Sequence, residues 1–271
     1  MAGNTESRGS AWRKAATVAG IVYREASRKQ EGGAVLFIAG IVFCMLAATN
    51  ADGRPEMARV VGELCLAMIW IVTVGLSLGL AARQLPNGWR SRTLPLLLSK
   101  PIRRAEYLWG LALGCGLVNA GAIAVCYLGF GLGQLSAGVG MATGLLQGMV
   151  LHWCALTLFS SLALSVSVWR VPSGLNVGIC LLVGALMLLA ARPLHDLLGM
   201  VDASGLRALV AAAYYLLPHF ELLDARAIIA GGGAVLPAGV FLSSIAYALS
   251  ASASVLKLGE WHLHRQSLQS E

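Results

Sequence analysis

Long runs without a single Asp, Glu, Lys or Arg restrict this sequence more than any other feature. A helix needs about 20 predominantly apolar residues to cross the hydrocarbon core of a bilayer. Five charge-free runs are of this length or longer: 32–51, 64–82, 107–169, 171–191 and 227–256. Charged residues make up 12% of the chain and apolar residues 57%, so a water-soluble domain would be left with large exposed apolar patches. The chain is therefore expected to be an integral membrane protein.

The number of spans follows from the third run, which has 63 residues and is too long for one helix across the bilayer. Its middle, from Gly129 to Gly144, contains the Gly, Ser and Gln residues that indicate a turn. We expect an all-α, polytopic fold with 1–32 as a tail, 33–256 as a single transmembrane domain and 257–271 as a second tail. The six predicted spans are about 33–50, 64–82, 107–129, 145–169, 174–191 and 236–256.

The distribution of basic residues predicts the orientation of these spans. Fifteen Lys and Arg fall in the tails and loops on one side, and five fall on the other. Because cytoplasmic loops carry the excess of Lys and Arg, both termini are predicted to be cytoplasmic, in the cytoplasmic (inner) membrane. A cleaved signal peptide ending near Ala47 and Ala48 is the alternative for the first span. However, about thirty residues precede the apolar segment, which is longer than a usual charged leader.

The tail before the first span has the pattern of an amphipathic helix. Its basic residues, Arg13, Lys14, Arg24 and Arg28, lie opposite an apolar face. We expect this helix to lie in the cytoplasmic interface with its apolar face among the acyl chains; an ordinary solvated helix is the alternative. The apolar face consists of Trp12, Ala15, Ala16, Ala19, Val22, Tyr23 and Ala26.

The loop between the second and third predicted spans combines leucines with cations. Residues 93–104 hold a short apolar stretch that ends in Ser99, Lys100, Pro101 and two arginines. Such a stretch in a cytoplasmic loop needs a partner that covers its leucines, and the cations favour an acidic or phosphate-bearing one. The alternative is a positively charged topology anchor whose leucines dip into the interface.

This loop resembles the cytoplasmic-loop signature of ABC-2 type ABC transporter permeases. The segment TLPLLLSKPIRRAEYLWG matches the family pattern at Thr93, Leu94, Leu97, Leu98, Ser99, Lys100, Pro101, Ile102, Arg104, Glu106, Tyr107, Leu108 and Gly110. A second stretch, YYLLPHFELLDAR (Tyr214 to Arg226), is similar to one in the branch that includes the nitrous-oxide-reductase maturation permease.

The resemblance implies a permease subunit that moves a substrate across the membrane with ATP hydrolysed by a separate ATPase subunit. Two permease subunits would pair, as a homodimer or with a related chain. This chain would be no enzyme and would bind no cofactor or metal. It has no GxxxxGK[ST] loop to hold nucleotide phosphates, so ATP and Mg²⁺ would be bound by the partner. The residues implied to couple the two subunits are Thr93, Leu94, Leu97, Leu98, Ser99, Lys100, Pro101, Arg103 and Arg104.

Two further segments are candidates for function. Arg170 and Pro172 mark a tight cytoplasmic turn, which is either a second contact with the ATPase or a turn alone. The run 208–220 is too short to cross a bilayer. It is therefore expected to be a re-entrant or interfacial segment on the outer side, with a possible outer gate at Pro218, His219, Phe220 and Glu221.

Polar and small residues within the spans have structural explanations. His152 and Asn119 are expected to form hydrogen bonds between helices rather than to bind a metal or a substrate. Small residues are expected to allow close helix contact at Gly110, Gly114, Gly121, Gly75 and Gly79. An intramembrane enzyme would need a GxSG or HExxH motif or a pair of acidic residues in a span, and the sequence has none. A non-catalytic membrane anchor or assembly factor stays open as the alternative to a permease.

Overall fold

The computed structural model describes residues 3–28, 31–52, 55–90, 103–138, 143–200, 205, 208, 220–224, 226, 229 and 235–268. Within these residues the fold is entirely helical: α1 (Gly3–Arg28), α2 (Glu31–Asp52), α3 (Pro55–Arg90), α5 (Arg104–Ser136), α6 (Leu145–Ser167), α7 (Ser173–Met200), the 3-10 helix η1 (Phe220–Leu223) and α10 (Ala238–Leu268). Five of them contain a segment long and apolar enough to cross a membrane: Gly32–Thr49, Arg59–Gly88, Ala105–Ser136, Leu145–Ser167 and Ala238–Arg265. The expectation of an all-α membrane protein is confirmed at this level.

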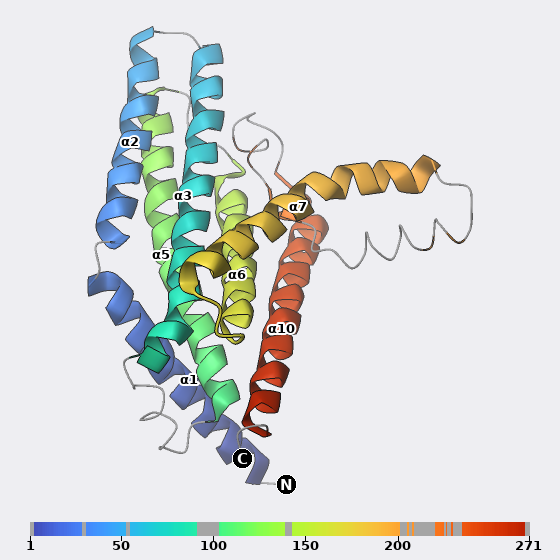
Figure 1. Ribbon diagram of the computed structural model, residues 1–271. Helices are drawn as coiled ribbons and strands as arrows, with labels where there is room; N and C mark the ends of the chain where they lie inside the picture. Colours follow the sequence, from blue (N-terminus) through green and yellow to red (C-terminus); the bar gives the residue numbers. More distant parts are fainter. Residues whose placement is uncertain are drawn as a thin grey trace.

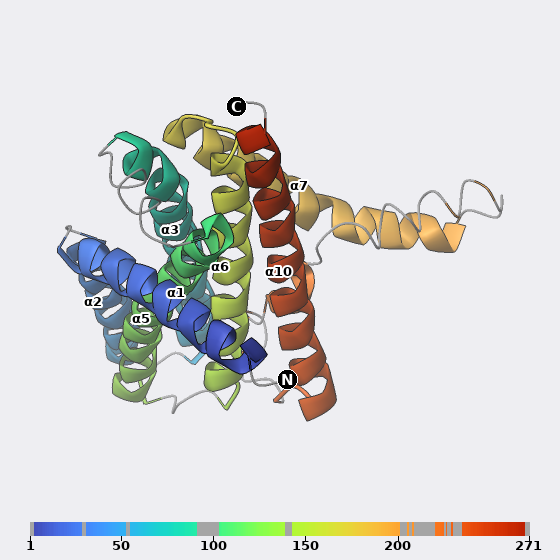
Figure 2. The same cartoon turned by 90° about the horizontal axis from the view of Figure 1, so that it is seen from below.

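Helices α2, α3, α5 and α6 form a bundle, and α10 packs along α6 (Figure 1). The start of α1, the start of α5 and the end of α10 lie at the same end of this bundle, which we call the α1/α10 end. Helix α7 is steeply inclined to the bundle and its second half projects sideways in both views (Figures 1 and 2). Its first part, Ser173–Met187, is an apolar helix shorter than the other five segments. The predicted span 174–191 is therefore helical, while its crossing of the membrane stays a prediction.

The turn predicted between the third and fourth spans is present, but α5 is longer than the predicted span 107–129. Helix α5 continues to Ser136, and α6 begins at Leu145. Gly138 has a φ of +72°, a left-handed conformation that glycine adopts without steric cost at the end of a helix. Helix α5 thus extends beyond the predicted span at both ends.

The N-terminal helix exists as predicted, but its apolar face is covered mainly by protein rather than left free for acyl chains. This face packs on α5 because Gly110 and Gly114 present no side chain there. Large apolar residues of α1 that remain exposed are Trp12, Ile21 and Tyr23. Of the seven residues predicted for this face, Ala15, Ala19, Val22 and Ala26 are buried, together with Val18, which was not predicted, whereas Ala16 is exposed like Trp12 and Tyr23.

Helix α3 contains Pro86 within its last turns. Because proline has no N–H, the carbonyl oxygen of Ala82 loses its helical donor. The Ser167 hydroxyl of α6 lies 3.3 Å from that oxygen and 2.8 Å from the Ala163 carbonyl oxygen, so its one proton is shared between these two acceptors. The turns that follow bend away from the bundle, as expected at a proline (Figures 1 and 2).

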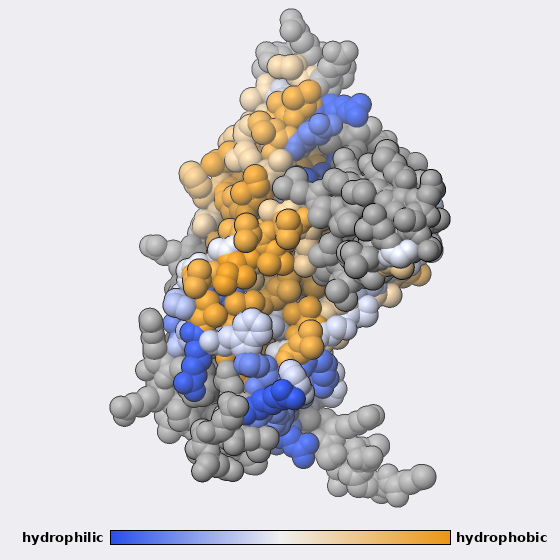
Figure 3. Space-filling view, turned by 45° about the vertical axis from the view of Figure 1, so that its right-hand side comes forward, coloured by the Kyte–Doolittle hydropathy of each residue, from blue (hydrophilic) through white to orange (hydrophobic). Residues whose placement is uncertain are grey.

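The surface has the distribution expected for a protein in a bilayer. Figure 3 shows a broad apolar band over the middle of the molecule, with hydrophilic residues gathered mainly at the lower end. Exposed large apolar residues of the molecule include Phe37, Ile71, Leu128 and Leu182. Five of the six cysteines, all but Cys44, are buried and none is in a disulfide, which agrees with their expected role as small apolar residues.

Candidate functional site

The predicted coupling segment lies largely outside the described residues. The predicted coupling residues that lie outside them are Thr93, Leu94, Leu97, Leu98, Ser99, Lys100 and Pro101. The structure describes the exposed Arg103 and the backbone of Arg104, where α5 begins. The backbone N–H of Arg103 donates to Oε2 of Glu106 over 3.0 Å. A side-chain acceptor at this position stabilises the first turn of a helix. Both arginines therefore stand at the ordered start of α5.

The first turns of α5 are connected to both α1 and α10. Lys14 Nζ of α1 lies 3.8 Å from Oε2 of Glu106. Trp109 Nε1 donates to Oε2 of Glu260 on α10 over 3.4 Å, and Lys257 Nζ donates to the same oxygen over 2.8 Å. A displacement of the start of α5 would therefore be transmitted to α1 and α10.

Two glycines bring α1 and α5 into close contact. A Cβ atom at Gly110 would lie 2.7 Å from the Val18 Cβ, and one at Gly114 would lie 2.7 Å from the Val22 Cβ. Both distances are too short for any side chain. The expected role of these two glycines is confirmed. Among the described residues, no atom lies within 4 Å of a Cβ position at Gly75, Gly79 or Gly121, so the prediction is wrong for those three in this part of the chain.

This contact predicts a difference between two alanine substitutions on α5. Gly114→Ala should lower the free energy of unfolding by about 1–3 kcal/mol because it forces α1 away. Gly116→Ala is the matched control, since a Cβ at Gly116 meets nothing within 4 Å, and better helix propensity should make it neutral or slightly stabilising. Unfolding in detergent with increasing denaturant measures both. Equal stability of the two variants would contradict the close packing of α1 on α5.

A buried asparagine stabilises the turn between α6 and α7. Asn176 is 0% exposed, and its Nδ2 donates to the carbonyl oxygen of Ala163 and to Ser167 Oγ over 2.9 and 2.7 Å. Arg170 has a φ of 58° and is exposed, as is Pro172. The two residues predicted as a second cytoplasmic contact thus stand on a firmly anchored turn.

A buried histidine joins three helices within the bundle. His152 of α6 is 1% exposed; its Nε2 lies 3.0 Å from Thr73 Oγ1 of α3, and its Nδ1 lies 3.3 Å from the Tyr127 hydroxyl of α5. Thr73 donates its own proton to the Ile69 carbonyl over 2.6 Å, so it accepts from Nε2–H, and Nδ1 accepts from Tyr127. The Trp70 ring stacks on the imidazole at a centroid distance of 5.5 Å. These contacts are the interhelical bonds that the sequence indicated for His152.

The predicted outer gate is described in part. Pro218 and His219 lie outside the described residues, and the Glu221 side chain is not described either. Phe220 is fully buried and stacks on Phe159 of α6 at a centroid distance of 4.5 Å. This residue is therefore a packing contact between the segment before α10 and the bundle.

An ion pair follows Phe220 and also reaches the bundle. Arg226 binds the Asp224 carboxylate through Nε and Nη2, over 2.8 and 2.7 Å. Burial raises the pKa of Asp224, but the hydrogen bonds from Arg226 outweigh it and hold this pKa below its ordinary value. The guanidinium also lies over the Trp70 ring, 5.4 Å from its centroid. Through Trp70, the segment before α10 is thus in contact with the group formed by His152, Thr73 and Tyr127.

Reasoning from the sequence did not find Trp70, Thr73, Tyr127 or the Asp224–Arg226 pair. The residues that hydrogen-bond to His152, Tyr127 and Thr73, come from other helices and lie 25 and 79 positions away in the chain. A single apolar helix carries no signal for such partners. Comparison with known proteins finds no family model that matches the chain and no curated protein whose sequence matches it significantly.

Proposed function

We propose that this chain is the membrane-spanning permease subunit of an ATP-driven transporter of the ABC-2 type. The observation that carries the proposal is the segment TLPLLLSKPIRRAEYLWG, which leads directly into α5. A second permease subunit completes the pathway, and an ATP-binding subunit docks on residues 93–104 from the cytoplasm. The transported substrate crosses the cytoplasmic membrane.

The packing of α5 supports this role because α5 contacts α1, α2, α3, α6 and α10. A force applied to the segment before Arg103 would enter a helix that packs against five neighbours. Capping by Glu106 and the tryptophan contact with Glu260 keep the first turns of α5 ordered. Rigid-body movement of packed helices is a common way of transmitting such a force.

The experiment that tests the proposal is capture of the chain from native membranes in mild detergent. An affinity tag after residue 271 should recover an ATP-binding subunit with a P-loop in a fixed ratio to this chain. Mass spectrometry of the eluate identifies and quantifies that subunit. A stable eluate that contains no nucleotide-binding chain would contradict the proposal and favour a membrane anchor.

The proposed topology has six spans with both ends in the cytoplasm. Its support is that α1, the start of α5 and the end of α10 share one end of the bundle (Figure 1), and that fifteen of the twenty basic residues fall on that side of the predicted topology.

Reporter fusions test this topology. Fusions after Asn50, Arg90, Gly138, Pro172, Ser204 and Glu271 should read outside, inside, outside, inside, outside and inside. The pair at Pro172 and Ser204 decides whether the inclined α7 crosses. The same reading at both positions, or an outside reading at Glu271, would contradict six spans.

A further inference from the structure

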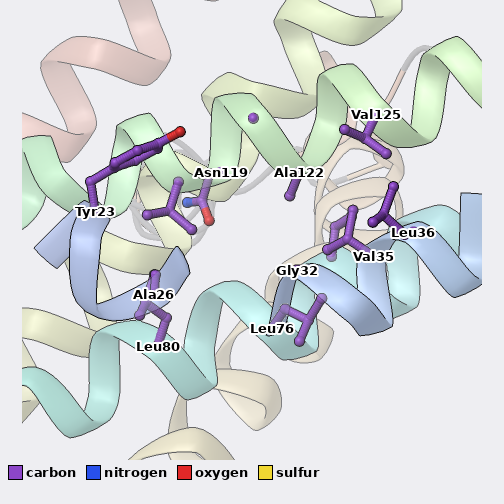
Figure 4. Close-up of a pocket in the computed structure, with 13 residues that line it drawn as sticks. Tyr23, Ala26, Gly32, Val35, Leu36, Leu76, Leu80, Asn119, Ala122 and Val125 are labelled. Atoms are coloured by element: carbon purple, nitrogen blue, oxygen red, sulfur yellow. The ribbon is translucent and has the colours of Figure 1, made fainter. Parts of the chain in front are cut away.

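A cavity of about 300 Å³ lies between α1, α2, α3 and α5, a volume at the lower end of the range for small-molecule sites. Figure 4 shows its labelled side chains converging from these four helices. Most of the lining residues are apolar, and Tyr23, Thr73 and Asn119 carry the polar groups. The lining residues used below are Tyr23, Gly32, Leu36, Asn119, Gly121 and Val125.

The hydrogen bonds around Asn119 fix the orientation of its amide. Ser160 Oγ donates to the Leu156 carbonyl over 2.8 Å. Ser77 Oγ lies 2.8 Å from Ser160 Oγ and 3.3 Å from the same carbonyl, so its proton goes to one of these two acceptors. Both hydroxyls have then used their protons and act as acceptors. They receive the two N–H groups of Asn119 over 3.0 and 2.9 Å.

This arrangement leaves the amide oxygen of Asn119 without a donor among the described residues. Asn119 is 3% exposed and lines the cavity together with Tyr23 and Thr73, so its Oδ1 is an unpartnered acceptor at a mostly apolar wall. An acceptor of this kind costs free energy unless a hydrogen bond satisfies it. The cavity therefore favours an occupant with an apolar body and one O–H or N–H donor.

The contacts of α1 and α2 with α5 show where the cavity lies along the bundle. Val22 of α1 is level with Gly114, and Ala39 of α2 is level with Gly129. Gly32, the first residue of the candidate span of α2, is thus level with the part of α5 that includes Asn119. Measured along α2, Asn119 is thus level with the start of the apolar segment, although it lies near the middle of the longer candidate span of α5 (Ala105–Ser136). Leu36 and Val125 lie at levels further into the apolar segment of α2.

We propose that this cavity binds one bilayer phospholipid whose headgroup carries a hydrogen-bond donor. Its acyl chain occupies the apolar part beside Leu36 and Val125, and a headgroup O–H or N–H donates to Asn119 Oδ1. Tyr23 lines the same end of the cavity, and tyrosine is typical of this depth in a membrane. Phosphatidylglycerol supplies hydroxyl donors and phosphatidylethanolamine an ammonium donor, whereas phosphatidylcholine supplies neither. The site is independent of the proposed coupling to an ATPase.

Native mass spectrometry of the purified full chain tests the proposal. Phosphatidylglycerol, phosphatidylethanolamine and phosphatidylcholine with the same acyl chains are added separately in equal amounts. We expect one molecule of either donor lipid to be retained about fivefold more than phosphatidylcholine, as one hydrogen bond allows. Equal retention of all three lipids by the unmodified chain would overturn the proposal.

Two variants separate the acceptor from the cavity. Asn119→Leu removes Oδ1 and leaves the protons of Ser77 and Ser160 in their existing bonds, so it should abolish the preference among the lipids. Gly121→Leu fills the cavity and should reduce retention of the donor lipids about fivefold as well. Gly40→Leu is its matched control, because Gly40 is equally open and lies outside the lining. If Asn119→Leu does not fold, Gly121→Leu decides: unchanged retention in that variant would also overturn the proposal.

Discussion

Replacing Arg103 and Arg104 together with glutamate should reduce recovery of the ATPase subunit with this chain about tenfold or more. Like charges placed against a complementary surface cost several kcal/mol, and each 1.4 kcal/mol changes an equilibrium constant about tenfold. Membrane insertion should be unaffected, since the other basic residues at the α1/α10 end still set the orientation. Quantitative mass spectrometry of the captured complex measures the ratio of the two subunits.

A second charge reversal at the same end of the molecule serves as the control. Arg13 and Arg24 are exposed on α1, and their joint replacement with glutamate changes the net charge by the same amount. This control should retain the ATPase subunit. Unchanged recovery in the variant at Arg103 and Arg104 would mean that the loop acts as a topology anchor alone.

His152→Phe should lower the free energy of unfolding by about 1–3 kcal/mol, the cost of a buried polar group that loses its partner. Phenylalanine can keep the stacking on Trp70, but it leaves the Tyr127 hydroxyl, 3.3 Å from Nδ1, without an acceptor. The free energy of unfolding in detergent is the measurement.

A double variant distinguishes this lost hydrogen bond from a packing defect. Tyr127→Phe together with His152→Phe removes the orphaned hydroxyl, so the double variant should recover part of the stability lost by His152→Phe alone. Additive losses in the two single variants would show that Tyr127 and His152 are not coupled.

The sequence predicted the helices of this fold well where hydrophobicity alone decides. Helix α6 (Leu145–Ser167) nearly coincides with the predicted span 145–169. The sequence predicted the structure less well where packing between helices decides. The apolar face of α1 was expected among acyl chains because nothing in its own sequence shows that Gly110 and Gly114 of α5 accept it.

The polar residues of the bundle were predicted by type but not by partner. His152 and Asn119 were expected to bond between helices, and both do. Their partners lie on helices distant in the sequence, and the free Oδ1 of Asn119 follows from counting the protons of Ser77 and Ser160. That count needs the distances between the hydroxyls, which no sequence pattern contains.

Photocrosslinking in native membranes tests the central claim most directly. A photoreactive benzoylphenylalanine in place of Arg103 should form a crosslink to an ATP-binding subunit that contains a P-loop, because this position adjoins the proposed docking segment. The same group in place of Trp12, an exposed residue of α1, should form no such crosslink. Crosslinks from position 103 to lipid alone, in membranes that contain the full complement of native proteins, would contradict the account.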